Sequence, residues 1–347
     1  MIKVLVVDDS ALIRSLLSEI IRSEPDFVLV GAAGDAYAAR DLVNQRQPDV
    51  ITLDVEMPKV DGLTFLEKLM KARPTAVVMI SSLTEQGADV TLRALEIGAV
   101  DYIAKPKIDI AKGIEEYRLE IITKIKAAAV AKIRAPSQSQ PKQEAKIRFK
   151  TTEKIIAIGA STGGTEAIKA VLSKMPVDSP GIVITQHMPP GFTTSFAKRL
   201  DSLCRVNVIE PLGGERIVPG HAYLAPGDKH LTVIRSGADY RIELSDGPRV
   251  SGHKPSVDVM FESVAAAVGS NALAVVLTGM GKDGALGIRY IAEQGGYTMA
   301  QDEATSMIFG MPQEAIKTGC VKQIVPLHEV SYRLVEVLNA MGRDYRI

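Results

Sequence analysis

Short apolar runs alternate with amphipathic stretches along residues 1–122. The apolar runs end at Val7, Ala33, Leu53, Ile80 and Ala104. The stretches with helical spacing cover residues 10–22, 35–46, 61–70, 86–97 and 109–125. Short apolar runs are typical of buried parallel strands, whereas apolar residues repeated every three or four positions indicate helices. Five such strand–helix units predict an α/β domain with a doubly wound, mostly parallel sheet.

A second α/β pattern begins at residue 151. Buried strands are predicted at 155–160, 181–185, 271–278, 297–300 and 322–326, and helices at 165–174, 256–268, 284–294 and 329–341. Residues 222–244 hold three short strand-like runs joined by Pro-Gly-Asp and Ser-Gly-Ala, which are turn sequences. The C-terminal part is therefore predicted to be a doubly wound parallel α/β domain with an antiparallel hairpin insertion.

A polar segment separates the two patterns. Residues 135–143 are rich in Pro, Ser and Gln and show no apolar period, which is typical of an exposed linker. Residues 127–132 are expected to extend the preceding helix towards it. The predicted organisation is thus an N-terminal domain over 1–122, a basic linker over 123–150 and a C-terminal domain over 151–347.

The net charge of zero hides an uneven distribution, since 41 basic residues balance 41 acidic ones. Residues 1–122 hold 14 basic and 20 acidic side chains, for a net charge of −6. The linker holds 8 basic and 1 acidic, net +7, and residues 151–347 hold 19 and 20, net −1. The C-terminal domain is thus not basic, and it lacks a helix-turn-helix pattern, so we expect no nucleic-acid partner.

Cysteines and apolar segments restrict the class of protein further. Cys204 and Cys320 lie far apart and form no metal-binding pattern, so neither a zinc site nor a disulfide framework is expected. The N-terminus leads directly into a strand-like run rather than a signal peptide, and no run of 18 apolar residues occurs. We expect a cytoplasmic monomer with no membrane insertion.

Acidic residues follow two of the predicted N-terminal strands. Asp8 and Asp9 follow the first strand and Asp54 follows the third. The carboxyl ends of parallel strands meet at one edge of a sheet, so these carboxylates are expected to converge. Mg²⁺ prefers such oxygen ligands and would relieve the repulsion between them. The alternative is that these acids are merely solvated or cap helices.

Two further polar residues end later strands of the same sheet. Ser81 ends the fourth strand and Lys105 follows the fifth. A carboxylate nucleophile, a divalent cation, a hydroxyl and an ammonium group together indicate an aspartyl-phosphate site. Ser82 remains a second candidate for the hydroxyl, although Ser81 directly follows the apolar run 77–80.

Asp8-Asp9, Asp54, Ser81 and Lys105-Pro106 resemble the receiver domain of bacterial response regulators over nearly all of residues 1–122. The resemblance implies a flavodoxin-like (βα)5 fold in which Asp54 accepts phosphate from a sensor histidine kinase. It also implies that Asp8, Asp9 and Asp54 hold Mg²⁺ together with the backbone of Glu56, and that Ser81 and Lys105 are the switch residues.

A G-x-S-x-G motif lies at 159–163, where a predicted strand ends and a helix begins. Its small residues permit a tight turn that exposes the hydroxyl of Ser161, and N–H groups at the helix start can face an oxyanion. The motif is weak by itself, because a glycine-rich turn can also hold a phosphate. The dinucleotide fingerprint G-x-G-x-x-G is not met, since position 161 is serine.

A nucleophilic serine needs a base, and histidine is the usual one. Among the five histidines, His187 directly follows the next predicted strand, 26 residues after Ser161. Neighbouring parallel strands would bring the two residues to one edge. His221 and His230 flank the hairpin region, and the remaining two lack this placement, His253 in a polar loop and His328 at the start of the last helix.

Two acids could orient the histidine. Asp283 follows the apolar run 272–277 through a glycine-rich turn, and Asp302 follows the run 297–300. Spacing favours Asp283 but leaves Asp302 open. The order Ser…His…Asp differs from that of α/β-hydrolases, which is acceptable because such triads are defined by geometry.

Three motifs, together with the receiver-like module and the basic linker, are similar to the chemotaxis response regulator protein-glutamate methylesterases. The motifs lie at 159–164, 186–189 and 277–284. The resemblance implies Ser161 as nucleophile, His187 as base, Asp283 as orienting acid and the Met280 N–H in the oxyanion site. It also implies that the substrates are glutamate γ-methyl esters on the cytoplasmic helices of chemoreceptors, with glutamine deamidation as a second reaction.

The resemblance further implies regulation by phosphorylation. Residues 1–122 would cover the cleft of Ser161 until a chemotaxis histidine kinase phosphorylates Asp54. Ester hydrolysis would proceed through an acyl-enzyme and need no cofactor. The alternative functions are a response regulator with a DNA-binding output and a phosphorylation-regulated nucleotide-binding module.

Overall fold

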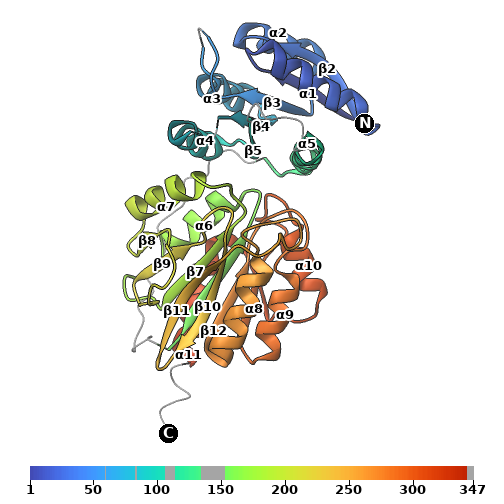
Figure 1. The fold of residues 1–347 in the computed structure, drawn as a ribbon. Helices are drawn as coiled ribbons and strands as arrows, with labels where there is room; N and C mark the ends of the chain where they lie inside the picture. Colours follow the sequence, from blue (N-terminus) through green and yellow to red (C-terminus); the bar gives the residue numbers. More distant parts are fainter. Residues whose placement is uncertain (59, 83, 106–113, 134–152, 342–347) are drawn as a thin grey trace. The chain divides into compact units, whose positions relative to one another are not determined.

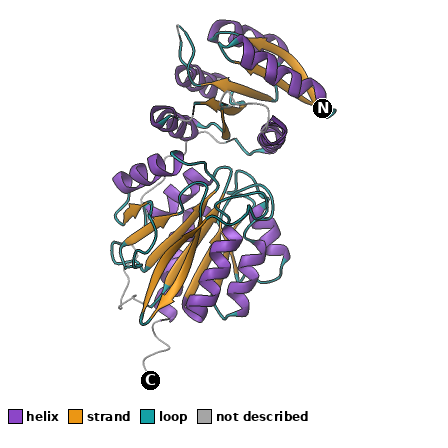
Figure 2. Cartoon of the chain, viewed as in Figure 1, coloured by secondary structure: helices purple, strands orange, loops and turns teal. Residues whose placement is uncertain are grey.

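The computed structural model describes residues 1–58, 60–82, 84–105, 114–133 and 153–341. The chain divides into two compact units, Met1–Ser139 and Gln140–Ile347. Each unit has its own parallel sheet with helices packed against it (Figures 1 and 2). Both units are therefore α/β, which confirms the predicted fold class. None of the helices in the described residues combines the length and apolarity needed to span a bilayer.

The first unit contains five strands and five helices among its described residues. The strands are β1 (Ile2–Val7), β2 (Phe27–Ala33), β3 (Val50–Asp54), β4 (Ala76–Ser81) and β5 (Asp101–Ala104). The helices are α1 (Ala11–Ser23), α2 (Ala36–Arg46), α3 (Gly62–Ala72), α4 (Glu85–Ile97) and α5 (Ile114–Val130). The strand order is β2-β1-β3-β4-β5 and every pair is parallel. This is the predicted doubly wound (βα)5 arrangement.

Side chains fix where these helices begin. Ser10, Asp35, Asp61 and Thr84 cap α1 to α4, each accepting a hydrogen bond from an N–H of the first turn. Such caps satisfy donors that have no partner within the helix. The strands β3 and β4 are buried along their whole length, as expected for the centre of a parallel sheet. Polar residues that directly follow these strands are therefore carried on a rigid edge.

The helix α5 runs past the amphipathic stretch 109–125 and into the predicted linker. It continues to Val130, so residues 123–130 of the predicted linker are helical, and the expected extension over 127–132 is largely present. Lys124 pairs with Asp101, and Lys126 lies 2.7 Å from both Glu24 and Asp26. Two of the linker's basic residues thus belong to the first unit. The rest of the predicted linker, over 134–150, lies outside the described residues, so its boundaries stay a prediction.

The second unit is built around a parallel sheet of seven strands. These are β6 (Ile155–Ala160), β7 (Gly181–Gln186), β8 (Asn207–Ile209), β9 (His221–Leu224), β12 (Ala272–Val276), β13 (Tyr297–Gln301) and β14 (Gln323–Val325). Their order is β14-β13-β12-β6-β7-β9-β8. The strands β10 (His230–Ser236) and β11 (Asp239–Ser245) form a separate antiparallel hairpin, which confirms the predicted insertion for two of its three runs. The first run belongs instead to β9, which pairs in parallel with β7 and β8.

Helices cover the seven-stranded sheet. They are α6 (Gly164–Leu172), α7 (Phe192–Leu203), α8 (Val257–Val268), α9 (Ala285–Glu293), α10 (Met311–Lys317) and α11 (Val330–Met341). The helix α9 contacts both α8 and α10, while α6 contacts α7 and α11 (Figure 1). The hairpin strand β10 packs on α8 over a core that includes Leu231, Ile242 and Phe261. The sequence patterns had missed α7, α10 and the short strand β8.

The order in which the chain adds strands to the sheet reverses between β6 and β12. These two strands are parallel neighbours, although 111 residues separate the end of β6 from the start of β12 in the chain. Ligands of doubly wound sheets bind at the carboxyl edge beside such a point. The loops after β6, β7 and β12 carry the serine, histidine and glycine-rich motifs. The fold therefore gathers the three motifs at one place.

Candidate active site

Strand register places Ser161 beside His187. Ala160, the last residue of β6, pairs with Gln186, the last residue of β7. The His187 N–H donates to the Ala160 carbonyl, and the Ser161 N–H donates to the Thr278 carbonyl at 3.0 Å. The backbone hydrogen bonds of the sheet therefore continue up to Ser161 and His187. Both side chains leave rigid strand ends rather than mobile loop tips.

Ser161, His187 and Asp283 form a continuous chain of hydrogen bonds. His187 Nδ1 lies 3.1 Å from Ser161 Oγ, and His187 Nε2 lies 2.8 Å from Asp283 Oδ2. A carboxylate only accepts, so Nε2 carries the proton and Nδ1 is left as the acceptor of the serine proton. The structure thus brings the three predicted side chains together in the order that nucleophilic catalysis requires.

Asp283 is fixed by further donors. Its carboxylate accepts hydrogen bonds from Ser256 Oγ at 2.8 Å and from the N–H groups of Val257 at 2.7 Å and Asp258 at 3.1 Å. Burial by itself would raise the pKa of Asp283, but the hydrogen bond and charge of His187 and the N–H donors outweigh burial and lower it. The carboxylate is thus held ionised beside the imidazole.

A second carboxylate, that of Asp258, supports the loop that carries Asp283. Asp258 Oδ1 accepts hydrogen bonds from the N–H groups of Gly284 and Gly287 at the start of α9. Burial raises the pKa of Asp258, and the neighbouring charge of Asp283 adds to this. Neither Ser256 nor Asp258 was among the predicted site residues, although both lie where a helix was predicted to begin.

Asp302, the rival acid, has a different environment. Its Oδ1 accepts from the Thr305 N–H at 2.9 Å and from the Thr305 hydroxyl. It therefore caps a turn after β13, because its side chain binds the N–H three residues further along the chain. Within the described residues Asp302 makes no hydrogen bond or ion pair with His187, whereas Asp283 makes both. The geometry thus favours Asp283 over Asp302.

Two glycines allow the backbone to approach Ser161 closely. A Cβ on Gly279 would lie 2.8 Å from Ser161 Cβ, and one on Gly164 would lie 2.0 Å from Gln186 Oε1. Gln186 is buried, and its Nε2 donates to the carbonyls of Ser161 at 3.0 Å and His187 at 3.3 Å. One amide thereby ties together the backbones of both residues.

Met280 lies in the turn that passes over Ser161. Its neighbour Gly279 accepts hydrogen bonds from the N–H groups of Gly310 and Met311 and donates to Ile308. Within the described part of the chain, the Met280 N–H itself donates to no acceptor. The turn is therefore held rigidly while leaving one N–H available, which fits an oxyanion donor. That role stays a prediction.

The structure adds a residue that the sequence analysis had set aside. The ring of His253 stacks on that of His187, with centroids 3.6 Å apart and planes inclined by 10°. The polar loop of His253 precedes α8 in sequence and gave no signal of strand-end placement. The sequence showed His253 only as part of a polar loop and gave no sign of this contact.

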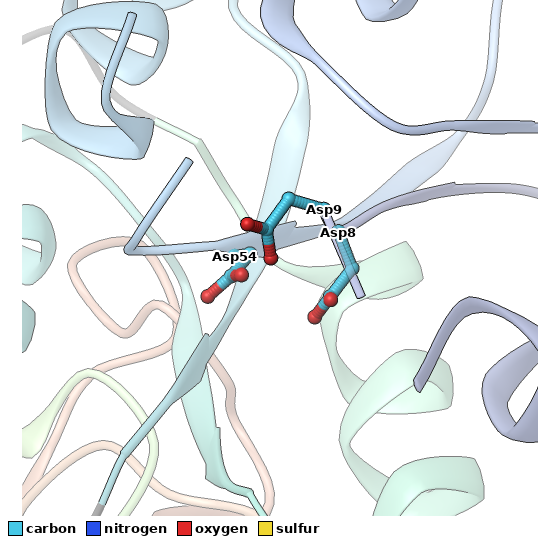
Figure 3. Close-up of side chains that lie close together, drawn as sticks. All are labelled: Asp8, Asp9 and Asp54. Carbon is cyan, nitrogen blue, oxygen red and sulfur yellow. The ribbon is translucent and has the colours of Figure 1, made fainter. Parts of the chain in front are cut away.

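Three carboxylates converge in the first unit, as predicted. The ligand atoms of Asp8, Asp9 and Asp54 lie within 4.8 Å of one another at the ends of β1 and β3 (Figure 3). Lys105 Nζ lies 2.8 Å from Asp54 Oδ2 and 3.5 Å from Asp8 Oδ2. Burial raises the pKa of Asp54 to about 6, and the charge of Asp8 adds to it while Lys105 opposes it.

The donor set suits a hard divalent cation. All three groups are carboxylates, and the buried Asp8 Oδ2 has no hydrogen-bond partner among the described residues. The Glu56 N–H donates to Asp54 Oδ1 at 3.2 Å, which places the Glu56 backbone beside the cluster. These observations fit the predicted Mg²⁺ site, although the ion and its ligands stay a prediction.

The two candidate switch hydroxyls differ in their partners. Ser81 is fully buried, lies 3.2 Å from the Gly87 carbonyl and accepts from Thr91 Oγ1 at 2.7 Å. Ser82 Oγ lies 3.4 Å from Glu56 Oε1. Neither hydroxyl is bonded to Asp54 in the described residues. Ser81 is engaged with α4, which fits a group that transmits a change at Asp54 to that helix, but the choice between the two stays open.

Comparisons with known proteins follow the same division of the chain. Residues 156–334 match the family model of CheB methylesterase, and residues 4–115 match that of the response regulator receiver domain. The chain is 58% identical, over 100% of its length and 99% of the relative, to protein-glutamate methylesterase/protein-glutamine glutaminase 2 of Pseudomonas aeruginosa. It is 56% identical to a protein-glutamate methylesterase/protein-glutamine glutaminase of Thiobacillus denitrificans, over 98% of each chain.

A solved structure resembles the second unit. It is the CheB methylesterase catalytic domain of Thermotoga maritima, with 38% sequence identity and a TM-score of 0.52. The similarity covers 53% of the present chain and 98% of that domain. Sequence and fold therefore point to the same family.

Proposed function

Because the chain belongs to the CheB methylesterase family and carries a receiver domain ahead of the catalytic domain, we propose that it removes methyl groups from glutamate side chains of chemoreceptors. Like its named relatives, it would also deamidate receptor glutamines. The activity is that of a phosphorylation-regulated hydrolase in chemotactic adaptation. The observation that carries the proposal is the hydrogen-bonded chain of Ser161, His187 and Asp283.

Acylation begins when Ser161 attacks the ester carbonyl carbon of the methylated glutamate. His187 Nδ1 takes the serine proton, and the imidazolium that forms is stabilised by Asp283 through Nε2–H. The tetrahedral intermediate then collapses. His187 Nδ1 returns the proton to the departing methoxide, so methanol leaves and the glutamyl group remains esterified to Ser161 Oγ.

Deacylation repeats these steps with water. His187 Nδ1 takes a proton from water as its oxygen attacks the acyl carbon, and the proton then passes to Ser161 Oγ. The products are a free glutamate carboxylate and the original serine. In deamidation the same sequence releases ammonia instead of methanol. The Met280 N–H is proposed to donate to the oxyanion in both steps.

The receiver domain is proposed to control this reaction. Asp54 would accept the phosphoryl group from a chemotaxis histidine kinase, with Mg²⁺ held by Asp8, Asp9, Asp54 and the Glu56 backbone. When bound, Mg²⁺ would neutralise the charge that develops on the phosphoryl oxygens. Lys105, with its ammonium 2.8 Å from Asp54, would pair with the phosphorylated side chain, and Ser81 would sense it.

Phosphorylation would relieve a restraint that the receiver places on the catalytic domain. A phosphoryl group can bias a receiver between two states that differ in how they dock. We also propose that the protein acts as a monomer in the cytoplasm, where receptor helices and kinase are accessible. The alternatives of a DNA-binding or nucleotide-binding output find no support, because residues 156–334 match an esterase family.

A serine-directed covalent probe tests the proposal directly. A fluorophosphonate should label Ser161, as located by peptide mass spectrometry, because His187 activates that hydroxyl. His187→Ala should suppress the label, whereas the exposed Ser202 serves as an internal control that stays unmodified. Absence of label on a folded chain would contradict the esterase mechanism.

A further inference from the structure

We propose that His253 is a positioning residue for the reaction at Ser161. Its imidazole lies 3.6 Å from that of His187, almost parallel to it, and thus covers one face of the proposed base. The inference rests on the proposed function, because it assigns His253 a part in the same reaction. His253 was not among the residues predicted for the site.

The two hydrogen bonds of His187 leave one motion free. Ser161 and Asp283 contact opposite edges of the imidazole, at Nδ1 and Nε2, and so define an axis through the ring. The ring can still tilt about that axis, which would misalign Nδ1 with its donor Ser161 and Nε2–H with its acceptor Asp283. A flat partner on one face opposes this tilt. The stacked ring of His253 supplies it and also keeps water from that face.

His253 is presented by a tight turn. The N–H of Val250 donates to the His253 carbonyl at 3.0 Å, and the N–H of His253 donates to the Val250 carbonyl at 2.9 Å. Ser251 and Gly252 between them have positive φ angles of 52° and 84°, as in the two-residue turns of hairpins. The turn therefore has one defined backbone conformation, which fixes the origin of the His253 side chain.

His230 anchors both ends of the segment that carries this turn. It is buried at the start of β10, and its Nε2 donates to the Pro248 carbonyl at 2.9 Å. Its Nδ1 accepts from the Ser256 N–H at 3.2 Å. One side chain thus bridges residues 248 and 256. Because Nδ1 must accept, His230 is neutral in this arrangement.

The same segment also holds the acid. Ser256 donates through Oγ to Asp283, and Val257 and Asp258 donate through N–H groups. Residues 248–258 therefore fix Asp283 at one edge of His187 and place His253 against its face. A single anchored loop sets two of the three constraints on the base, and Ser161 supplies the third.

The stack also links activity to the charge of His253. His187 becomes an imidazolium during the reaction, and two protonated rings at 3.6 Å would repel each other. The working enzyme therefore needs a neutral His253. Among the described residues, Asp283 contacts His187 directly, Asp258 in α8 interacts with the charge of Asp283, Arg249 and Lys254 flank His253 in its loop, and Asp228 lies 3.4 Å from Lys254.

Three variants test the proposal in the full-length chain with methylated receptor as substrate. His253→Ala removes the ring, and His253→Phe keeps a flat ring that cannot be protonated. His328→Ala, which removes a histidine that is 57% exposed, is the matched control. Methanol release gives kcat, KM and the pH profile of kcat/KM, and thermal unfolding reports whether each variant is folded.

The expected results separate positioning from general stability. His253→Ala should lower kcat by about 10- to 100-fold with KM changed less than about 2-fold, because the base is misaligned but the substrate surface remains. His253→Phe should recover kcat to within about 3-fold of wild type, since the flat contact is restored. In the Phe variant the acidic limb of the pH profile should depend on one proton, where wild type depends on two.

Several outcomes would overturn the inference. Wild-type kcat in folded His253→Ala would show that the stack does not matter, and a Phe variant as slow as the Ala variant would show that the flat contact does not. If the acidic limb of the pH profile were unchanged in the Phe variant, the charge of His253 would have no part in the pH dependence. A wild-type chain that releases no methanol would instead overturn the proposed function, which keeps the two failures distinguishable.

Discussion

Both units carry polar side chains at the carboxyl ends of parallel strands. The two sites differ in how far the protein itself compensates the charge of the central carboxylate. At the edge of the second unit, the carboxylate of Asp283 receives four hydrogen bonds and its pKa is lowered. At the edge of the first unit, Asp54 lies beside Asp8 and Asp9, and burial raises its pKa to about 6. The protein's own donors outweigh the effect of burial at Asp283, whereas at Asp54 burial outweighs Lys105 and the Glu56 N–H.

This difference teaches what each edge is built to do. A site that must react the same way at every turnover benefits from groups that are already positioned and solvated by the protein. A site that reports an event benefits from charges that are balanced only when something binds. Asp283 fits the first description. Asp54, with Lys105 as its counter-ion, fits the second, because a cation and a phosphoryl group would complete it.

The largest effect is expected from removing the proposed nucleophile, the hydroxyl of Ser161. Ser161→Ala should lower ester hydrolysis by at least about 10⁴-fold, because no acyl-enzyme can form. Steady-state methanol release measures it, with Ser202→Ala as the control on an exposed helix position. A loss of less than 10-fold, roughly the range of an indirect effect, would contradict a nucleophilic role for Ser161.

The next effect distinguishes the two acids that the sequence left open. Asp283→Asn should lower kcat by about 10²- to 10⁴-fold, because Asn no longer enforces the His187 tautomer or stabilises the imidazolium. Asp302→Asn should stay within about 3-fold of wild type, since Asp302 caps a turn. The reverse pattern in the same assay would reassign the orienting acid.

A third change removes the carboxylate of Asp54, the proposed phosphate acceptor. Asp54→Asn should abolish the stimulation of methanol release by a small-molecule phosphodonor, so that the ratio of rates with and without donor falls to about 1. The variant should also lose the hydroxylamine-sensitive acyl phosphate. Asp41→Asn, whose side chain is 57% exposed, is the control. Full stimulation of Asp54→Asn would place the phosphoryl group elsewhere.

The smallest effect concerns stability and pH. The folded-state pKa of Asp283 lies below its reference value of 3.8, so its ionised form stabilises the fold above that pH and this stabilisation is lost as pH falls further. Asp283→Asn should therefore lower the midpoint of thermal unfolding by about 2–4 °C at pH 7. The gap should shrink below pH 4, as calorimetry can show. A gap that widens on acidification would contradict the assigned charge state.

The sequence predicted the parts of both sites that strand ends determine. Ser161 and His187 directly follow buried apolar runs, and parallel neighbours must then meet at one edge. The same argument gathers Asp8 with Asp54. Periodicity also predicted most of the helices, because their apolar faces pack on the sheets. The helix α7 was missed although its apolar residues recur every three to four positions, at Phe192, Phe196, Leu200 and Leu203.

What could not be predicted depends on where loops fold back. His253 stacks on His187 from a loop whose residues 248 and 256 are both bound by His230 on a hairpin strand. Nothing in the polar pattern of that loop encodes this contact. Likewise Asp283 and Asp302 both follow strands, so spacing ranked them weakly. The distinction came from tertiary contacts, namely the hydrogen bond between Asp283 and His187 and the N–H donors at the start of α8.

Methanol release from methylated receptor, measured on the full chain with and without a phosphodonor, tests the central claim most directly. The claim is that phosphorylation of Asp54 controls the preorganised esterase site of Ser161 in the same chain. We predict slow release without donor, faster release with it, and none from Ser161→Ala in either condition. Release that is independent of the donor, or that survives Ser161→Ala, would contradict this account.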